Sequence, residues 1–293
     1  MSMILHELSD FYGNNADNIY YHYRRKNMVD TPILHFAHAN GFPAGCYNKL
    51  QELLRGNYTV IAIEQMGHNS HYPVDDNWES LTSELIDYIE RNAGGSAIIG
   101  IGHSMGGILT FLAAYNRPEL FKAIIMLDPP LAYGPLAFFL YLGKKLGLME
   151  RAKIVAQTKR RRTQWASREE AEAYFKKKSP FSNFDSDCLR DYVRYGTIEN
   201  KAGVKLSFDV NVETDIFRTT PHNLNFLTAI SIPGSVVVGE HSYVSIRSVN
   251  KFAKKHALEP VRFEGGSHLF PLEYPERTAT LIKETIGKLE AQR

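Results

Sequence analysis

Short apolar runs rich in β-branched residues alternate along the chain with longer stretches in which apolar residues recur at helical spacing. This alternation is typical of a mainly parallel sheet covered by helices on both faces. We expect an additional antiparallel pair of strands before residue 30. The predicted strands of the parallel sheet are residues 33–37, 59–64, 96–101, 123–127, 235–239 and 260–264.

Two of the helical stretches are well marked. Residues 78–92 carry apolar side chains on one face, as expected of a helix that covers a sheet, and this helix ends at Gly94 and Gly95. Residues 105–116 are apolar nearly all round, which predicts a deeply buried helix that ends before Pro118. The first helix thus lies on the surface of the core and the second within it.

The strand and helix alternation stops after Asp128. Roughly 100 residues pass before the next buried strand, too many for a structureless loop in a compact domain. The pattern predicts helices at residues 135–150, 151–162, 167–178 and 186–195. We therefore expect a helical cap of residues 129–221, bounded by prolines, that interrupts a core domain of residues 1–128 and 222–293.

Composition narrows the class of protein. Of 293 residues, 44% are hydrophobic, and 34 Lys and Arg face 32 Asp and Glu. A disordered chain is excluded, and a chain of this length can bury a large core without disulfides. A formal net charge of +2 favours no nucleic-acid partner. The basic run at residues 159–162 is interpreted as a solvated helix face.

The cysteines and the apolar stretches indicate the compartment. Cys46 and Cys188 lie far apart, which is typical of inert thiols in a reducing compartment and excludes a Cys-rich zinc site. No stretch approaches the ~20 apolar residues of a membrane span. We expect a soluble cytoplasmic protein with no membrane span, and the sequence leaves a homodimer open.

The strongest chemical signal is a G-x-S-x-G motif, Gly102-His103-Ser104-Met105-Gly106, placed between a predicted strand and the apolar helix. A serine at this junction sits on a sharp turn that exposes its hydroxyl. The helix that begins at Met105 directs its amide and the positive end of its dipole toward the reacting group. The alternative is a glycine-rich turn in which the serine only caps the helix.

The sequence resembles the α/β-hydrolase superfamily over nearly its whole length. Four segments carry the resemblance in the family's order: His38-Ala39-Asn40-Gly41-Phe42-Pro43, residues 64–70, the serine motif, and Gly265-Gly266-Ser267-His268. The resemblance implies an α/β-hydrolase fold, a mostly parallel central sheet flanked by helices with an inserted helical cap.

The resemblance also implies an oxyanion hole, in which backbone amides bind the negative oxygen of the intermediate. The amides expected to form it are those of Phe42 and Met105. The family reads His-Gly-x-Pro after the first central strand, whereas here two residues separate His38 from Gly41. This departure leaves open the shape of the loop, a role for Asn40, and the alternative that the segment is a simple turn.

A serine hydroxyl needs a base, and His268 matches the family's catalytic histidine loop after the last strand. The histidine in turn needs a carboxylate. In most of the family this acid follows the strand after the cap, where this chain has Glu240 and where Ser242 occupies the expected aspartate position. In a minority it follows the strand before the cap, which favours Asp128. Both acids remain candidates, and Asp128 is preferred.

These residues predict acyl transfer through a serine-bound intermediate. Hydrolysis of a small to medium hydrophobic carboxylic ester is the expected reaction. The alternatives are C–C bond, thioester or lactone hydrolysis, perhydrolysis, and a non-catalytic member that binds a small molecule. Ser104 excludes relatives that use an aspartate nucleophile. Binding of nucleic acid through the basic run is the least favoured hypothesis.

The ester substrate is expected to contact residues near the serine and apolar residues that open the cap. His103 is interpreted mainly as a packing residue, although it remains a candidate through its place beside Ser104. We expect no cofactor and no metal, because the chain has no ligand spacing, P-loop or dinucleotide turn. The candidate substrate-binding residues are Asn40, His103, Leu131, Tyr133, Phe138 and Phe139.

Overall fold

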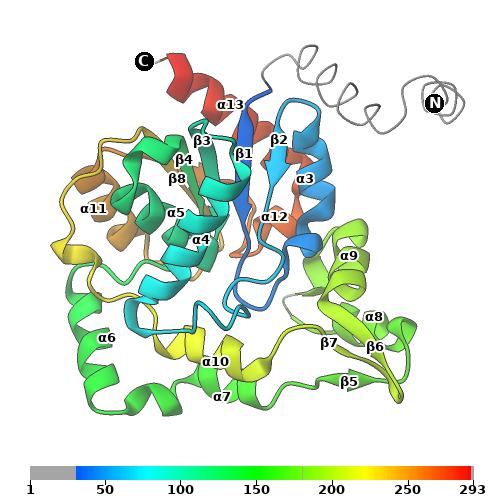
Figure 1. The fold of residues 1–293 in the computed structure, drawn as a ribbon. Coiled ribbons are helices and arrows are strands. Elements are labelled where there is room, and N and C mark those ends of the chain that lie inside the picture. Colours follow the sequence, from blue (N-terminus) through cyan, green and yellow to red (C-terminus); the bar gives the residue numbers. More distant parts are fainter. Residues whose placement is uncertain (1–30, 180, 292–293) are drawn as a thin grey trace, which may run out of the picture. The chain divides into compact units, whose positions relative to one another are not determined.

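A parallel six-stranded sheet forms the centre of the unit that begins at Ile33 (Figure 1). The computed structural model describes residues 31–179 and 181–291, so the antiparallel pair expected before residue 30 lies outside the described residues. The strand order is β2-β1-β3-β4-β8-β9. The strands are β1 (Ile33–Ala37), β2 (Thr59–Ile61), β3 (Ile98–His103), β4 (Phe121–Leu127), β8 (Gly234–Gly239) and β9 (Glu259–Phe263).

Each inner strand supplies apolar side chains to both faces of the sheet. In β4, Ile124 and Met126 join one buried cluster, while Ile125 and Leu127 join the other. This period of two explains why the strand reads as an unbroken apolar run in the sequence. The expectation of a mainly parallel sheet flanked by helices is confirmed.

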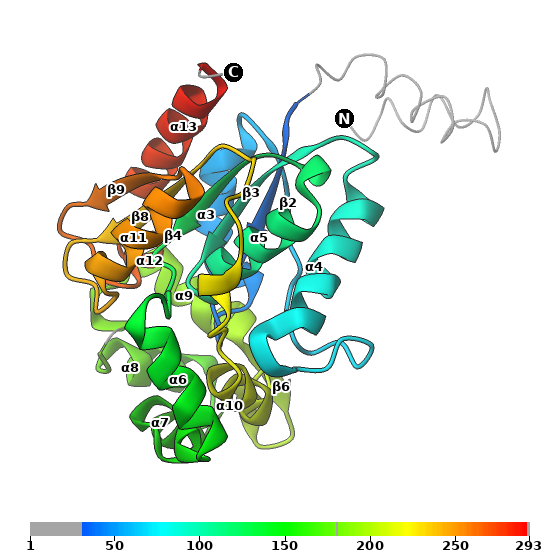
Figure 2. The same ribbon diagram turned by 90° about the vertical axis from the view of Figure 1, so that its left-hand side faces the viewer.

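Helices cover both faces, as Figures 1 and 2 show. The buried residues of α4, α5 and α11 belong to one apolar cluster and those of α3 and α13 to the other. The covering helices are α3 (Asn48–Arg55), α4 (Glu79–Asn92), α5 (Met105–Asn116), α11 (Ile246–His256) and α13 (Pro275–Ala291), and a short helix α12 (Phe270–Glu273) precedes α13.

Five of the six strands differ from the expected boundaries by one to three residues, and two of these differences bear on the site. β2 ends at Ile61, three residues early, because its last partner on β1 is His35 and the chain beyond it turns to bond elsewhere, with the Glu64 carbonyl accepting from the Ala44 amide at 2.9 Å. β3 runs two residues further than expected, since Gly102 and His103 still pair with β4. The sheet therefore delivers Ser104 directly at the end of a strand.

The segment between β4 and β8, here called the insert (residues 129–233), folds beside the carboxyl ends of the strands (Figure 1). Its helices are α6 (Pro135–Lys145), α7 (Lys153–Lys159), α8 (Arg168–Lys176), α9 (Ser186–Gly196) and α10 (Val210–Arg218). The first expected helix, 135–150, ends early near Gly147, which has a left-handed backbone. The cap boundaries at residues 129 and 221 remain a prediction.

The insert is largely helical, as expected of a helical cap, and it also holds a small antiparallel sheet that was not expected, of order β5-β7-β6. The strands are β5 (Gln164–Trp165), β6 (Thr197–Asn200) and β7 (Gly203–Leu206). They are two to four residues long and partly polar, so they carry too little periodicity to be seen in sequence. Helix α10 was also not anticipated.

Two further sequence observations concern the cysteines and membrane spans. Cys46 and Cys188 are both free and buried, and burial raises the pKa of each thiol. Within the described ranges, no helix is long and apolar enough to cross a bilayer.

Candidate active site

Ser104 sits on a strained turn between β3 and α5, with φ 53° and ψ −117°. Such a backbone is costly for a residue with a side chain and is held here by close packing. A Cβ on Gly102 would lie 2.0 Å from the Gly106 carbonyl oxygen, and a Cβ on Gly106 would lie 2.1 Å from the Ala37 oxygen. The two motif glycines are therefore required by contact between backbones, and the serine between them projects beyond the sheet.

Asp128 follows β4, the strand paired with β3, and is fully buried. Its backbone is also left-handed, with φ 48°. The carboxylate accepts hydrogen bonds from the Gly239 amide at 2.7 Å, the Ser242 hydroxyl and His268 Nδ1. Three donors from two separate loops fix its orientation. Ser242, at the family's usual acid position, thus bonds to the acid supplied by the neighbouring strand.

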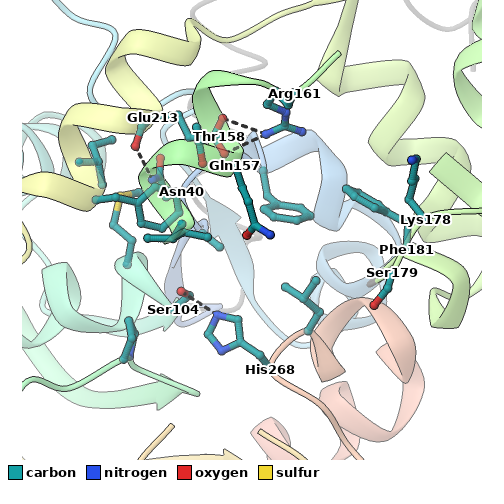
Figure 3. A pocket seen from close by; sticks show the side chains of 18 of the residues that line it. Asn40, Ser104, Gln157, Thr158, Arg161, Lys178, Ser179, Phe181, Glu213 and His268 are labelled. Atoms are coloured by element: carbon teal, nitrogen blue, oxygen red, sulfur yellow. Dashed lines mark hydrogen bonds and ion pairs between the residues drawn. The ribbon is translucent and has the colours of Figure 1, made fainter. Parts of the chain in front are cut away.

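His268 links the serine to this carboxylate, and Figure 3 shows its hydrogen bond to Ser104. Its Nδ1 lies 2.6 Å from Asp128 Oδ2, and its Nε2 lies 3.0 Å from Ser104 Oγ. With the proton on Nδ1, the ring donates to the carboxylate and accepts from the hydroxyl. The structure therefore brings all three residues of the expected triad together.

Glu240, the alternative acid, is engaged elsewhere. Its carboxylate accepts from Arg262 at 2.7 Å and from the Gly265 amide at 2.8 Å. These bonds tie the loops after β8 and β9 to each other, and none reaches His268. The geometry favours Asp128 over Glu240 as the partner of the histidine.

His103 lies beneath the histidine loop and does not line the cavity described below, so the expectation that it contacts substrate is wrong and its interpretation as a packing residue fits its place. It is fully buried, and its Nε2 donates to the His268 carbonyl at 2.8 Å. Tyr47 donates to the other ring nitrogen, Nδ1, at 2.7 Å. Burial lowers the pKa of His103 to about 3, so the ring stays neutral and supports the His268 loop.

The turn after β1 is held by His38 and carries the expected oxyanion donor. His38 Nδ1 donates to the Ala39 carbonyl, and Nε2 accepts from the Met66 amide, both at 2.8 Å. The Phe42 amide itself donates to that Ala39 carbonyl at 3.1 Å, so it must share or exchange this bond to reach an oxyanion. Met105 is the first residue of α5, so its amide has no acceptor within the helix.

A cavity of about 730 Å³ opens above Ser104 and His268, between the sheet and the insert. Polar groups gather on the side opposite the serine, where Figure 3 shows Asn40, Gln157, Thr158, Arg161 and Glu213. Aromatic side chains supply much of the remaining wall, namely Phe42, Trp78, Tyr174, Phe175, Phe181, Phe217 and Tyr243.

Of the expected substrate contacts, Asn40 lines this cavity, where it donates to the Glu213 carbonyl at 2.9 Å. Leu131 and Tyr133 instead pack into the core, with the Tyr133 ring against Phe252. Phe138 and Phe139 lie on α6 and are 61% and 65% exposed. These four do not line the cavity, because α7, α8 and α10 form its wall in place of α6.

The basic run at residues 159–162 is exposed at Lys159, Arg160 and Arg162, as expected of a solvated face, although α7 ends at Lys159 and Arg161 departs from the pattern. Arg161 turns inward and bonds both carboxylate oxygens of Glu213 at 2.8 Å and the Tyr192 hydroxyl at 3.0 Å. Burial raises the pKa of Glu213, and the guanidinium opposes that rise. Nothing in the sequence near Arg161 identifies Glu213, which lies on α10, as its partner.

The cavity supplies side chains for acid and base chemistry. Among the described residues, no group of three or more His, Cys, Asp and Glu is arranged to hold a metal ion.

Comparisons with known proteins bear on the family and the fold. A family model described as "Alpha/beta hydrolase family" matches residues 36–281. The monoglyceride lipase of Mus musculus is 24% identical over 283 residues, covering 92% of this chain and 86% of the lipase. The abhydrolase domain-containing protein AKT2 of Alternaria alternata is 26% identical over 231 residues, covering 65% of this chain and 83% of AKT2.

Among solved structures, E-2-(acetamidomethylene)succinate hydrolase is similar in fold, with a TM-score of 0.70 and 21% identity. The match covers 87% of this chain and 91% of that one. A carboxylesterase from Nitrososphaera gargenis has a TM-score of 0.59 and 18% identity, covering 90% of this chain and 92% of that one. These likenesses bear on the fold alone.

Proposed function

Because the chain belongs to the alpha/beta hydrolase family, we propose that it is a serine hydrolase that cleaves carboxylic esters through an acyl-enzyme. The observation that carries the proposal is the hydrogen-bonded series Ser104–His268–Asp128 at the floor of the cavity, with distances of 3.0 and 2.6 Å. Catalytic roles for these three residues are part of the proposal.

In the proposed first step, Ser104 Oγ attacks the ester carbonyl while His268 Nε2 takes the hydroxyl proton. Asp128 holds the ring tautomer and stabilises the imidazolium. The Met105 amide, at the positive end of α5, and the Phe42 amide stabilise the oxyanion. His268 then protonates the departing alcohol, and water releases the acid from Ser104 with the histidine again acting as base.

A small to medium hydrophobic ester fits this cavity best. Aromatic side chains from both the core and the insert line it, and Phe42 stacks on Phe181 at 6.0 Å between ring centres. The lipase likeness agrees with an ester that has a hydrophobic part. Thioester, lactone or C–C substrates would use the same triad, and no contact in the cavity favours them.

The test is hydrolysis of p-nitrophenyl esters of graded acyl length by the native protein and by Ser104→Ala. Ser83→Ala is the matched control, because Ser83 is exposed on α4 and bonds only within that helix. We expect turnover by native protein and control and its loss in Ser104→Ala. Equal turnover in all three would contradict the serine mechanism, and no turnover in any would contradict ester hydrolysis.

A cytoplasmic location and a homodimer complete the proposal. Two buried free thiols agree with a reducing compartment. Subcellular fractionation and sedimentation at micromolar concentration test the two points separately.

A further inference from the structure

Two cationic side chains meet around one aromatic ring in the wall of the cavity. The Arg162 guanidinium carbon lies 5.5 Å from the centre of the Tyr174 ring, and Lys178 Nζ lies 5.1 Å from the same centre. All three side chains line the cavity that contains Ser104. We call them the Tyr174 subsite. Figure 3 shows Lys178 across the cavity from Ser104.

Positive charges in this wall of the cavity outnumber negative charges. Glu213 also lines the cavity, but Arg161 bonds both of its oxygens, and only 7% of its side chain is exposed. Arg162 pairs with Glu170 at 2.7 Å. No ion pair is recorded for Lys178 within residues 31–179 and 181–291. The Tyr174 subsite therefore carries about one positive charge without a carboxylate partner.

The donor set identifies the chemistry of a ligand. A guanidinium, an ammonium and a phenol hydroxyl are donors to anionic oxygen. A single unmatched charge suits a carboxylate better than a phosphate, which carries close to two negative charges near neutral pH. Phe175 and Phe181 also line the cavity and offer apolar surface for a hydrocarbon chain. Their rings lie 4.8 Å apart, with Phe175 against Tyr174 at 5.4 Å and Phe181 against Phe42 at 6.0 Å between ring centres.

We propose that the Tyr174 subsite binds a carboxylate carried by the substrate, so that the preferred substrates are esters with a second, ionised acid group separated from the ester by an apolar chain. The proposal rests on the proposed ester hydrolysis at Ser104 and deepens it. One end of the substrate lies at the serine, the chain lies on the aromatic wall, and the acid group lies between Arg162 and Lys178.

Binding to the Ser104→Ala protein tests the subsite without turnover. Monohexyl esters of dicarboxylic acids of increasing length are compared by calorimetry with the matching dihexyl esters, at low salt and at 0.15 M salt. Both cationic side chains are partly exposed to water, so we expect about five- to tenfold tighter binding of the charged ester at the best length. Higher ionic strength is expected to reduce this preference.

Charge variants in the Ser104→Ala protein locate the effect. Lys178→Gln is expected to lose about three- to fivefold of the preference, and Lys178→Glu to abolish it. Lys177→Gln removes the same charge from the adjacent exposed residue, which does not line the cavity, and is expected to keep the preference. Both lysines are exposed, so these changes are expected to leave folding intact.

The outcomes separate this proposal from the proposed function. Equal binding of charged and neutral esters, no binding of either, or the same loss in Lys177→Gln would overturn the subsite. Failure of the native protein to hydrolyse p-nitrophenyl esters, charged or neutral, would overturn ester hydrolysis while the binding result stands. Carboxylate preference in kcat/KM that Lys178→Gln removes would support both.

Discussion

The floor and the wall of the cavity are built in different ways. At the floor, Ser104 and Asp128 project from paired strands, and both have left-handed backbones held by backbone packing and hydrogen bonds. In the wall, Arg161 and Glu213 come from distant parts of the insert and hold each other through their charges. The floor fixes the position of the reacting groups, whereas the wall can change its side chains while the strands stay in place.

The largest expected effect concerns the floor. Asp128→Asn removes the charge that stabilises the imidazolium and disturbs the histidine tautomer, so we expect kcat to fall by ~10⁴. Glu240→Gln, whose partners are Arg262 and the Gly265 amide, is expected to keep nearly full activity. Steady-state kinetics on one p-nitrophenyl ester checks both, and the reverse order would assign the acid to Glu240.

Substitutions in the wall are expected to change the stability of the folded protein. Arg161→Met leaves the Glu213 carboxylate buried without its partner, which should lower the free energy of unfolding by about 3–5 kcal/mol. Replacing both, as Arg161→Met with Glu213→Leu, is expected to recover most of that loss, because no buried charge remains. Urea denaturation compares Arg161→Met, Glu213→Leu and the double variant with the native protein. Additive losses would show that the pair does not act as a unit.

Acid is expected to destabilise the core through buried histidines. Burial lowers the pKa of His35 and His103 to about 3 and that of His38 and His256 to about 4, each from 6.5. The unfolded chain therefore binds more protons below pH 6.5, and stability falls as pH decreases until the folded pKa is passed. Each histidine contributes a loss of about 1.4 kcal/mol per pH unit in that window.

Urea unfolding between pH 7.5 and 5 measures this slope. His256 suits a matched variant, because both ring nitrogens are buried without a hydrogen-bond partner among the described residues and the ring packs on Phe111 and Phe252. His256→Leu is expected to reduce the slope of unfolding free energy against pH by the contribution of one histidine. An unchanged slope would show that His256 does not remain neutral in the folded protein.

The smallest effect is expected outside the cavity. Phe138→Ser and Phe139→Ser alter exposed side chains of α6, so kcat/KM should stay within about twofold and stability within about 0.5 kcal/mol. Phe181→Ser changes the aromatic wall and is expected to raise KM about tenfold. If the α6 variants raised KM as much, α6 would close over the cavity when substrate binds.

The sequence predicted the floor of the cavity because the residues that build the floor are marked by local features of the chain. Gly102 and Gly106 mark the turn at Ser104, so the motif selects the serine. An apolar strand ends directly before Asp128, and the family resemblance made this residue the preferred acid while leaving Glu240 as the alternative. The central sheet could also be predicted from the sequence, because strands buried on both faces read as continuous apolar runs.

The sequence did not predict the wall of the cavity in the same way. Glu213 and Arg161 are separated by 52 positions, and their pairing depends on how α7 and α10 pack. Aromatic residues on α6 looked like cavity lining because helical spacing cannot tell which neighbour a helix faces. Tyr47 was missed for a related reason, since its hydroxyl is tied to His103 only in three dimensions.

The position of Asp128 has a consequence for how such a protein can be altered. Nucleophile and acid lie only 24 positions apart, both before the insert, and the loop after β8 supplies little more to the acid than the Gly239 amide and the Ser242 hydroxyl. Redesign of the insert leaves this pair within one continuous piece of chain. The β8–α11 loop, which does not have to supply the acid, places Tyr243 in the cavity wall, so its sequence can be varied to reshape the cavity while Gly239 and Ser242 are kept.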